Sequence, residues 1–308
     1  MIMSTMSPDR LEPRAVRLAD WGVLRARGDD AQSFLHGQLT SDMLHLDATQ
    51  ARLAGYCSAK GRLLASFVVW RRAPGEVLLA CSAELLPATL KRLAMFVLRA
   101  KCRLDDASAE LPLWGLTGEV SGMPGSAWQR AEVAGGEIVR LPDALIDGQT
   151  VPRALFAGAV PPAAATPDLE RWRWLEVTSG VPRITGATVE QFVPQMVNLE
   201  LVGGVDFQKG CYPGQEVVAR SQYRGTLKRR AVLLEGAAPM TPGQEVFHDA
   251  DPAQPAGMVV LGASASGRHA ALVEIKLAAL EGGTLHLGAA GGPPLQPLAL
   301  PYALTAPA

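Results

Sequence analysis

One stretch of the chain gathers residue types that could carry out chemistry: Lys209-Gly210-Cys211-Tyr212-Pro213-Gly214-Gln215-Glu216. Its glycines and its proline form turns, and the composition after Gly214 suits a helix, so we predict a loop that runs into a helix. Cys211 would then lie just before a helix N-terminus, where unpaired backbone N–H groups and the helix dipole stabilise an anion. Together with the positive charge of Lys209, this position favours a reactive thiolate over a buried, inert thiol.

Charged residues on either side of Cys211 have competing interpretations. Glu216 could belong to a reactive site, or it could be a helix-start carboxylate placed to suit the helix dipole. Five cations follow within eleven residues: Arg220, Arg224, Lys228, Arg229 and Arg230. A charge run of this kind is usually a solvated face. Beside a reactive loop, a binding site for a carboxylate or phosphate is comparably well supported.

The other cysteines and the histidines lack the spacing of a metal or catalytic site. Cys57, Cys81 and Cys102 form no CxxC pair, so we expect reduced thiols and no intrinsic metal site. The histidines are scattered and are expected to be surface or packing residues: His36, His45, His248, His269 and His286. No dinucleotide-binding, P-loop or hydrolase motif is present.

The bulk composition excludes several classes of partner. The chain has 308 residues with 29 basic and 30 acidic side chains, a balance that gives no general attraction to nucleic acid or to an anionic membrane. No run resembles a secretory signal, and the apolar runs are too short to span a bilayer. We therefore expect a cytoplasmic protein, monomeric, without direct nucleic-acid binding and without membrane contact.

Several elements can be predicted from local patterns. A helix of capping-box type is expected to start at Asp29-Asp30-Ala31-Gln32. Residues Leu63–Trp70 form a short apolar run typical of a buried strand, and Glu84–Ala100 repeats leucines at helical spacing. A Pro/Ala linker over Ala157–Pro167 would end with Thr166 as the N-cap of a further helix.

The last part of the chain changes character near Arg230. Short β-like runs alternate there with Gly/Pro turns, and no good helix remains, which indicates a small β-barrel or sandwich. We predict an N-terminal α+β segment over residues 10–110, a second α+β segment over residues 111–225 that ends in the Cys211 loop, and a β-barrel over residues 226–308.

The loop Lys-Gly-Cys-Tyr-x-Gly-Gln-Glu resembles the signature of the YgfZ-type folate-binding proteins, which are relatives of the glycine cleavage T protein, an aminomethyltransferase. Other stretches resemble the same family, so the resemblance covers almost the whole chain. His36 stands at the first Gln of the family's Gln-Gly-Gln-x-Thr-x-Asp element. The further matching stretches are Phe34–Asp42, Cys57–Arg62, Gln191–Leu199, Gly203–Val205 and Leu300–Tyr302.

The resemblance implies an α+β fold of the aminomethyltransferase type: two α+β segments and a C-terminal antiparallel β-barrel in a ring, with tetrahydrofolate in the central opening. In bacterial members two tryptophans are placed at the folate site. By local match these are Trp21 and Trp172, although Trp174 makes the second assignment ambiguous. An indole lying flat against a pterin or aminobenzoyl ring is physically reasonable, and core packing explains both tryptophans equally well.

Two departures from the aminomethyltransferases bear on activity. Their paired aspartates correspond here to Ala65 and Ser66, and a glutamate expected at the pterin corresponds to Thr178. None of these residues can act as a charged base, although Glu176 could substitute for the missing glutamate. Aminomethyltransferase activity is therefore not expected.

The resemblance implies a folate-binding accessory protein for the assembly or repair of iron–sulfur clusters, with an indirect link to tRNA modification and with assembly factors or client enzymes as partners. Cys211 and Lys209 would form the reactive centre. Cys57 is the candidate for a second thiol, because it also lies in a matching stretch, Cys57–Arg62. The rest of the signature would position the loop or face an anion: Gly210, Tyr212, Gly214, Gln215, Glu216 and Arg220. Two alternatives stay open: a folate-dependent one-carbon transferase or oxidoreductase, and an interaction scaffold with a vestigial folate site.

Overall fold

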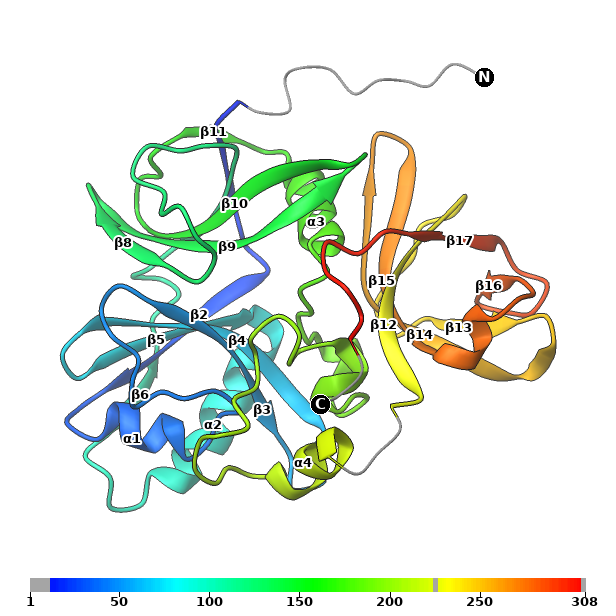
Figure 1. The fold of residues 1–308 in the computed structure, drawn as a ribbon. Coiled ribbons are helices and arrows are strands. Elements are labelled where there is room, and N and C mark those ends of the chain that lie inside the picture. Colours follow the sequence, from blue (N-terminus) through cyan, green and yellow to red (C-terminus); the bar gives the residue numbers. More distant parts are fainter. Residues whose placement is uncertain (1–11, 224–226, 306–308) are drawn as a thin grey trace.

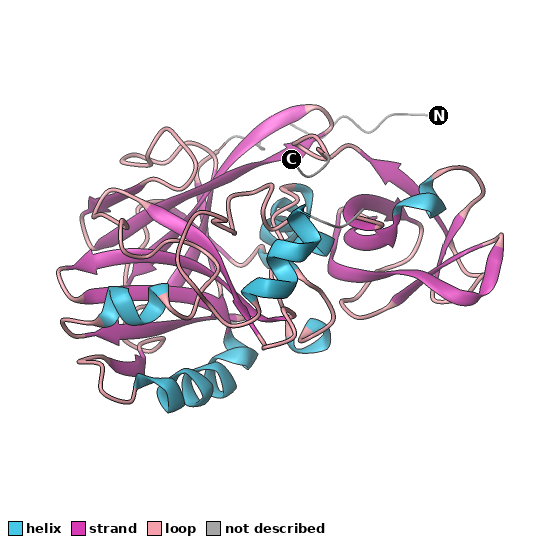
Figure 2. Ribbon diagram, turned by 60° about the horizontal axis from the view of Figure 1, so that its bottom comes forward, coloured by secondary structure: helices cyan, strands magenta, loops and turns pink. Residues whose placement is uncertain are grey.

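A computed structural model describes residues 12–223 and 227–305, and within these ranges the strands form three β-sheets, the last of them closed into a barrel. The two open sheets lie one above the other on one side of the molecule, and the barrel lies on the opposite side (Figure 1). Helix α3 lies between the second sheet and the barrel, in contact with strands of both (Figures 1 and 2). The molecule is thus of the expected α+β type, with few helices and a barrel at its C-terminal end.

The first sheet is antiparallel and buries its central strands on both faces. Its order is β3 (Ala51–Cys57), β4 (Leu63–Ala73), β5 (Glu76–Ser82), β2 (Trp21–Arg27) and β6 (Arg103–Asp106). Along β4, Phe67 and Val69 pack into one core cluster, while Val68 and Trp70 pack into another. Because both faces are covered, the strand is an unbroken apolar run and not an alternation. The predicted strand over Leu63–Trp70 is confirmed.

The second sheet combines strands from distant parts of the chain. Its order is β11 (Ala164–Thr166), β1 (Arg14–Arg17), β7 (Leu113–Thr117), β10 (Gln149–Gly158), β9 (Gly136–Ile146) and β8 (Arg130–Val133). Strand β1 pairs in parallel with β11 and antiparallel with β7, so the start of the chain belongs to this sheet. The predicted division of the chain at residues 110 and 225 stays a prediction.

The helices are short, and two of the predicted caps are wrong. The elements are α1 (Ala31–His36), η2 (Ala83–Leu85), α2 (Leu86–Val97), α3 (Leu169–Thr178), η3 (Gly186–Thr188), η4 (Pro194–Val197), α4 (Gln215–Tyr223) and η5 (Leu277–Leu280). At α1 the Asp30 carboxylate accepts from the Lys101 amide and does not cap the helix, while Gln32 donates to the carbonyls of Met43 and Leu46.

Helix α3 begins later than predicted, because Thr166 is occupied elsewhere. Thr166 is the last residue of β11, where it pairs with Val16. The N-cap is instead Asp168, whose Oδ1 accepts from the Arg171 amide at 3.0 Å. The linker expected over Ala157–Pro167 therefore contains the end of β10 and the whole of β11.

The C-terminal barrel is closed and antiparallel, in the order β12 (Arg229–Gly236), β15 (Arg268–Lys276), β14 (Asp251–Ala265), β13 (Glu245–His248), β16 (Leu285–Leu287) and β17 (Pro294–Leu298). Core residues from the first sheet, α3 and the barrel form one continuous cluster. A polar joint reinforces this contact: the Asn198 side chain donates to the Ala231 carbonyl at 2.8 Å and accepts from the Ala231 amide at 3.3 Å.

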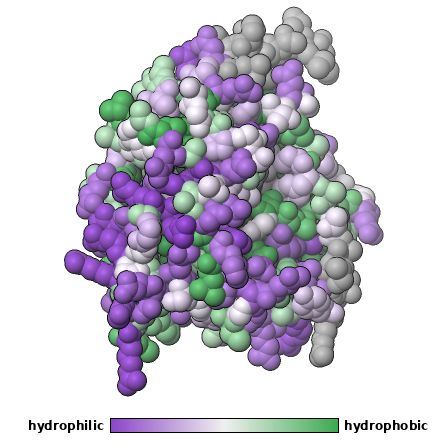
Figure 3. All heavy atoms as spheres, turned by 60° about the vertical axis from the view of Figure 1, so that its left-hand side comes forward, coloured by the Kyte–Doolittle hydropathy of each residue, from purple (hydrophilic) through white to green (hydrophobic). Residues whose placement is uncertain are grey.

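The exterior follows the usual polarity of a protein surface. On the face that comes forward in Figure 3, polar residues cover most of the area and apolar residues form small scattered groups. Among the residues that the structure describes, no helix is long and apolar enough to cross a membrane.

Candidate functional site

The predicted loop lies just ahead of α4, as expected from its glycines and proline. Cys211 is exposed, whereas the neighbouring Tyr212 is buried at 7% exposure. The loop therefore presents a thiol to solvent while its aromatic residue anchors it in the core. Gln215 begins α4 and is partly buried, and Glu216 is exposed in the first turn.

Lys209 fastens the loop to the end of α1. Its Nζ donates to the carbonyl oxygens of His36 at 2.5 Å and Leu39 at 2.9 Å, and it lies 4.8 Å from the centre of the Tyr212 ring. Carbonyls at a helix C-terminus lack intrahelical donors, so a lysine is a suitable partner for them. Burial lowers the pKa of Lys209 to about 8, although the negative charges of Asp206, Asp42 and Cys211 act in the opposite direction.

Two glycines pack the loop against the turn between β3 and β4. Gly214 has φ +78°, and a Cβ on it would lie only 2.4 Å from the Ser58 carbonyl oxygen and 2.6 Å from Gly61 Cα. A Cβ on Gly61, at φ +71°, would lie 2.8 Å from Val217 Cβ in α4. No other residue type fits these positions without movement. The structure thus brings together the Cys211 loop, the end of α1 and the Cys57–Arg62 turn.

Cys57, which the sequence suggested as a second thiol, lies beneath the loop in the core. It is 1% exposed and belongs to the same core cluster as Tyr212. Burial raises its pKa to about 12, so it stays protonated near neutral pH. Among the residues that the structure describes, no three or more His, Cys, Asp or Glu side chains are grouped so as to hold a metal ion.

The downstream cations do not form one face. Arg220 is exposed on α4, and Arg224 lies outside the described residues. Arg230 is buried in an ion pair with Glu200, and Arg229 donates to both oxygens of Glu274. Arg230 therefore ties the barrel to the preceding part of the chain, and Arg229 bonds within the barrel. Arg220 remains the exposed cation on the helix that follows the loop.

The predicted folate-binding tryptophans lie in the other part of the candidate site. Trp21 lines a cavity of about 20 Å³, together with Glu176 and Arg183. The Arg183 guanidinium lies 4.9 Å from the centre of the Trp21 ring and pairs with Glu176, with Nε to Oε1 at 2.6 Å. Trp21 Nε1 is buried without a hydrogen-bond partner. The cavity thus has an aromatic face, an ion pair and one unsatisfied donor.

Trp172 is a core residue that does not line this cavity. It is 1% exposed, and a Cβ on Gly115 would lie 2.3 Å from its Cε3 atom, so only glycine fits beneath the indole.

Thr178 donates to the Trp174 carbonyl at 2.8 Å within its own helix and lines a different cavity of about 160 Å³. At the position of the missing aspartates, the Ser66 hydroxyl accepts from the Ile184 amide at 3.0 Å.

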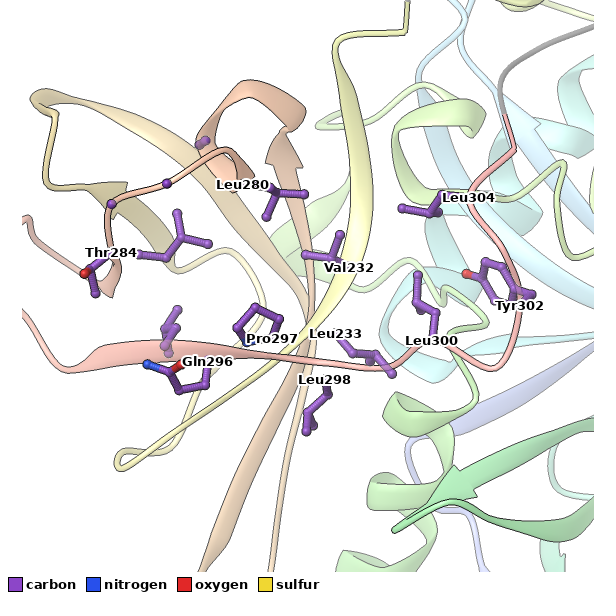
Figure 4. Close-up of a pocket in the computed structure, with 15 residues that line it drawn as sticks. Val232, Leu233, Leu280, Thr284, Gln296, Pro297, Leu298, Leu300, Tyr302 and Leu304 are labelled. Carbon is purple, nitrogen blue, oxygen red and sulfur yellow. The ribbon is translucent and has the colours of Figure 1, made fainter.

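A larger apolar cavity lies on the barrel, away from the predicted residues. It measures about 430 Å³ and is lined by side chains of β12, β17 and the C-terminal segment, among them Leu233, Leu298 and Tyr302 (Figure 4). None of the residues predicted from the Cys211 signature or the tryptophan match lines it.

Sequence analysis expected His36 to be a surface or packing residue. Its side chain is 16% exposed, and its Nε2 lies 3.5 Å from the position that a Cβ of Gly210 would take. The signal available in the sequence was its position inside a matching element, Phe34–Asp42, and not the spacing of the histidines.

No family model matches the chain. Among curated proteins, the "tRNA-modifying protein YgfZ" of Edwardsiella ictaluri is 34% identical over 263 residues, which cover 77% of this chain and 75% of the relative. The protein of the same name from Photobacterium profundum is 31% identical over 248 residues, 74% of this chain and 71% of the relative.

The fold is similar to that of a solved aminomethyltransferase. The glycine cleavage system aminomethyltransferase T of Bartonella henselae superposes with a TM-score of 0.73 at 17% identity, over 95% of this chain and 86% of that protein. At this identity the similarity shows the fold alone.

Proposed function

Because the chain belongs to the YgfZ family of tRNA-modifying proteins, we propose that it is a cytoplasmic, tetrahydrofolate-binding accessory protein that supports assembly or repair of iron–sulfur clusters in other enzymes. tRNA modification would then depend on it indirectly. The observation that carries the proposal is the environment of Cys211: an exposed thiol on a loop that Lys209, Tyr212 and Gly214 hold in place.

Cys211 is the reactive group in this proposal. Its loop precedes the N-terminus of α4, where helix dipole and free amides favour an anion, and Lys209 adds a nearby positive charge. The cluster belongs to the client protein, since one cysteine falls short of the four ligands that a cluster usually needs. Lys209 and the signature glycines position the thiol, and the exposed Arg220 is available to a partner's anionic group.

Tetrahydrofolate binding is proposed at the Trp21 cavity. The lining fits a folate ring, because the Trp21 indole offers a flat face and an unsatisfied Nε1 donor, and Glu176 offers a carboxylate. At about 20 Å³ the cavity holds no more than a water-sized group. Binding therefore requires the side chains that line the cavity to move apart and enlarge it. The folate would supply a one-carbon or reducing group.

The enzyme alternative lacks a free base at this cavity. Ala65, Ser66 and Thr178 carry no carboxylate, and the Thr178 hydroxyl already donates to the Trp174 carbonyl. Glu176, the remaining candidate, is held by Arg183 through two hydrogen bonds at 2.6 and 3.1 Å. Both of its carboxylate oxygens therefore already accept hydrogen bonds from Arg183. A folate-dependent transferase or oxidoreductase is therefore the second candidate, and an interaction scaffold with a vestigial folate site is the third.

The central test replaces the thiol in cells. Cys211→Ala, expressed in a strain that lacks the gene for this protein, should fail to restore the activity of an iron–sulfur enzyme that depends on it. Cys102→Ala is the matched control, since this partly buried thiol lies outside the loop, and it should restore activity. Full complementation by Cys211→Ala would refute the proposal.

Folate binding is tested separately with purified protein. Tetrahydrofolate should quench tryptophan fluorescence saturably in the wild type, and Trp21→Phe should remove most of that quenching. Trp114→Phe is the control, because Trp114 lies in β7 next to Arg17 and away from the cavity. An absence of saturable quenching in the wild type would favour the scaffold. Turnover of a one-carbon tetrahydrofolate would favour the enzyme.

A further inference from the structure

Trp128 lines the same cavity as Trp21. Side chains of both open sheets bound this cavity, and the two sheets lie one above the other in Figure 1: Phe67 belongs to β4 of the first sheet, and Arg153 to β10 of the second. Trp21 begins β2 in the first sheet, whereas Trp128 lies in the loop that joins β7 to β8 of the second. The two indoles therefore reach the cavity from different sheets.

The two tryptophans form the outer part of the cavity lining. Trp21 and Trp128 are partly exposed, whereas every other residue that lines the cavity, within the part of the chain that the structure describes, is buried. Glu176 and Arg183, for example, are 5% and 8% exposed. A ligand that arrives from solvent therefore meets these two indoles first.

The backbone of Trp128 is held in a conformation that a bulky residue rarely adopts. Its φ is +64°, in the left-handed region, which is unfavourable for a residue with a Cβ. Its amide donates to the Arg140 carbonyl at 2.8 Å, and its carbonyl accepts from the Ala51 amide at 2.7 Å. Because Arg140 lies in β9 and Ala51 begins β3, these bonds tie Trp128 to both sheets. Residues held in unfavourable conformations concentrate at ligand sites.

The indole is not what this backbone requires. A glycine would adopt the left-handed conformation without strain, and the same loop carries glycines at Gly122 and Gly125. The Trp128 side chain packs at the edge of two core clusters. Any large apolar side chain could fill that space, so packing alone does not explain an aromatic ring at this position.

Trp128 is better placed than Trp172 to be the second tryptophan that the resemblance implies. Trp172 is enclosed in the core at 1% exposure and does not line the cavity. Of the six tryptophans in the chain, Trp21 and Trp128 are the two that line it.

We infer that Trp128 is a second ligand-binding tryptophan, and that the cavity takes a fused heteroaromatic ring of the pterin class in contact with both indoles. The inference rests on the proposed tetrahydrofolate site and adds a residue that recognises the ring. An indole favours an aromatic ring through stacked or edge-to-face contact. The unsatisfied Trp21 Nε1 suits a ring that carries hydrogen-bond acceptors. The cavity enlarges when the two partly exposed indoles move outward, while the buried strands stay in place.

The test compares two replacements that place the same demand on the backbone. Trp128→Phe keeps an aromatic face, whereas Trp128→Leu keeps only apolar bulk, and both carry a Cβ. Isothermal titration calorimetry of the full-length protein with tetrahydrofolate, under reducing conditions, measures the affinity of each variant. Trp128→Leu should bind roughly fivefold more weakly than Trp128→Phe, because an aromatic pair gains about that much beyond its buried area. Trp114→Leu is the control and should bind as the wild type does, since Trp114 is also partly exposed but does not line the cavity.

Equal affinities of Trp128→Phe and Trp128→Leu would assign Trp128 to packing alone, which would overturn the inference and leave the proposed folate site standing. An absence of binding in the wild type would overturn the folate site itself, and the inference with it. A second measurement covers poor folding of the variants: carbene footprinting of the wild type, read by mass spectrometry, with and without tetrahydrofolate. The ligand should protect Trp128 from labelling and leave Trp114 unchanged, and unchanged labelling of Trp128 would overturn the inference.

Discussion

The packing of the Cys211 loop on the β3–β4 turn leads to a sharp prediction for Gly214→Ala. Gly214 and Gly148 both have φ +78°, but a Cβ on Gly148 would meet nothing within 4 Å, whereas one on Gly214 would lie 2.4 Å from the Ser58 carbonyl oxygen. The pair therefore separates backbone strain from steric conflict. A left-handed alanine costs about 1 kcal/mol or slightly more, which both variants should show.

Gly214→Ala should lose considerably more stability than the control. Forcing an extra methyl into a packed site costs roughly 1–3 kcal/mol, so the total is about 3 kcal/mol. At roughly 2–4 °C per kcal/mol for a chain of this order of size, the Tm should fall by about 6–12 °C in Gly214→Ala and about 2–4 °C in Gly148→Ala.

Urea unfolding followed by circular dichroism, together with thermal scans, measures both effects. The core cluster extends from the first sheet into the barrel, so a single cooperative transition is expected. Equal losses for Gly214→Ala and Gly148→Ala would refute the reasoning, because the loop would then not rest on the Ser58–Gly61 backbone.

Three further predictions concern charges and buried polar groups. Burial lowers the pKa of Lys209 to about 8 in the folded protein, against an ordinary value near 10.4. Between pH 8 and about 10.4 the unfolded chain therefore binds more protons than the folded protein, and the free energy of unfolding should rise with pH across this range. Lys209→Met should remove that rise in urea-unfolding midpoints measured from pH 7 to 10.5, and an unchanged slope would contradict the burial of the ammonium. Glu176→Gln leaves the buried Arg183 guanidinium without its main partner and should cost about 3–5 kcal/mol in urea unfolding; a loss below about 1 kcal/mol would argue against the ion pair. Tyr302→Phe removes the hydroxyl that donates to the Gly180 carbonyl at 2.7 Å and should cost about 1 kcal/mol, and no measurable loss would mean that water replaces this bond.

Elements were predicted well from the sequence where neighbouring residues alone determine the local structure. The apolar run over Leu63–Trp70 became β4, and glycines and a proline ahead of Gln215 became a loop that enters α4. The short β-runs after Arg230 became the closed barrel. In each case the residues that form the element lie within a few positions of one another.

Predictions failed where a distant partner decides the outcome. Thr166 does not cap α3, because its backbone pairs with Val16 in the second sheet. The cation run after the loop is divided, because Arg229 and Arg230 meet Glu274 and Glu200.

The contact between His36 and the loop could not be predicted from the chain alone. It joins residues that are more than 170 positions apart. Its neighbours in sequence, including Asp42, carry no spacing that indicates this contact. Only the packing of α1 beneath the loop brings Nε2 toward Gly210.

The joint between Asn198 and Ala231 has a consequence for how this region can be engineered. The two residues exchange hydrogen bonds, so residues 199–230 begin and end at one point, where Asn198 meets β12 of the barrel. They contain the whole Cys211 loop and α4. A segment whose two ends lie side by side can be exchanged as a unit, and we call residues 199–230 the cassette. A stretch taken from a homologue should graft here without rethreading either open sheet, since the two splice points already lie side by side. Exchange of this cassette between relatives would transfer the reactive loop as a unit while the Trp21 cavity stays that of the recipient.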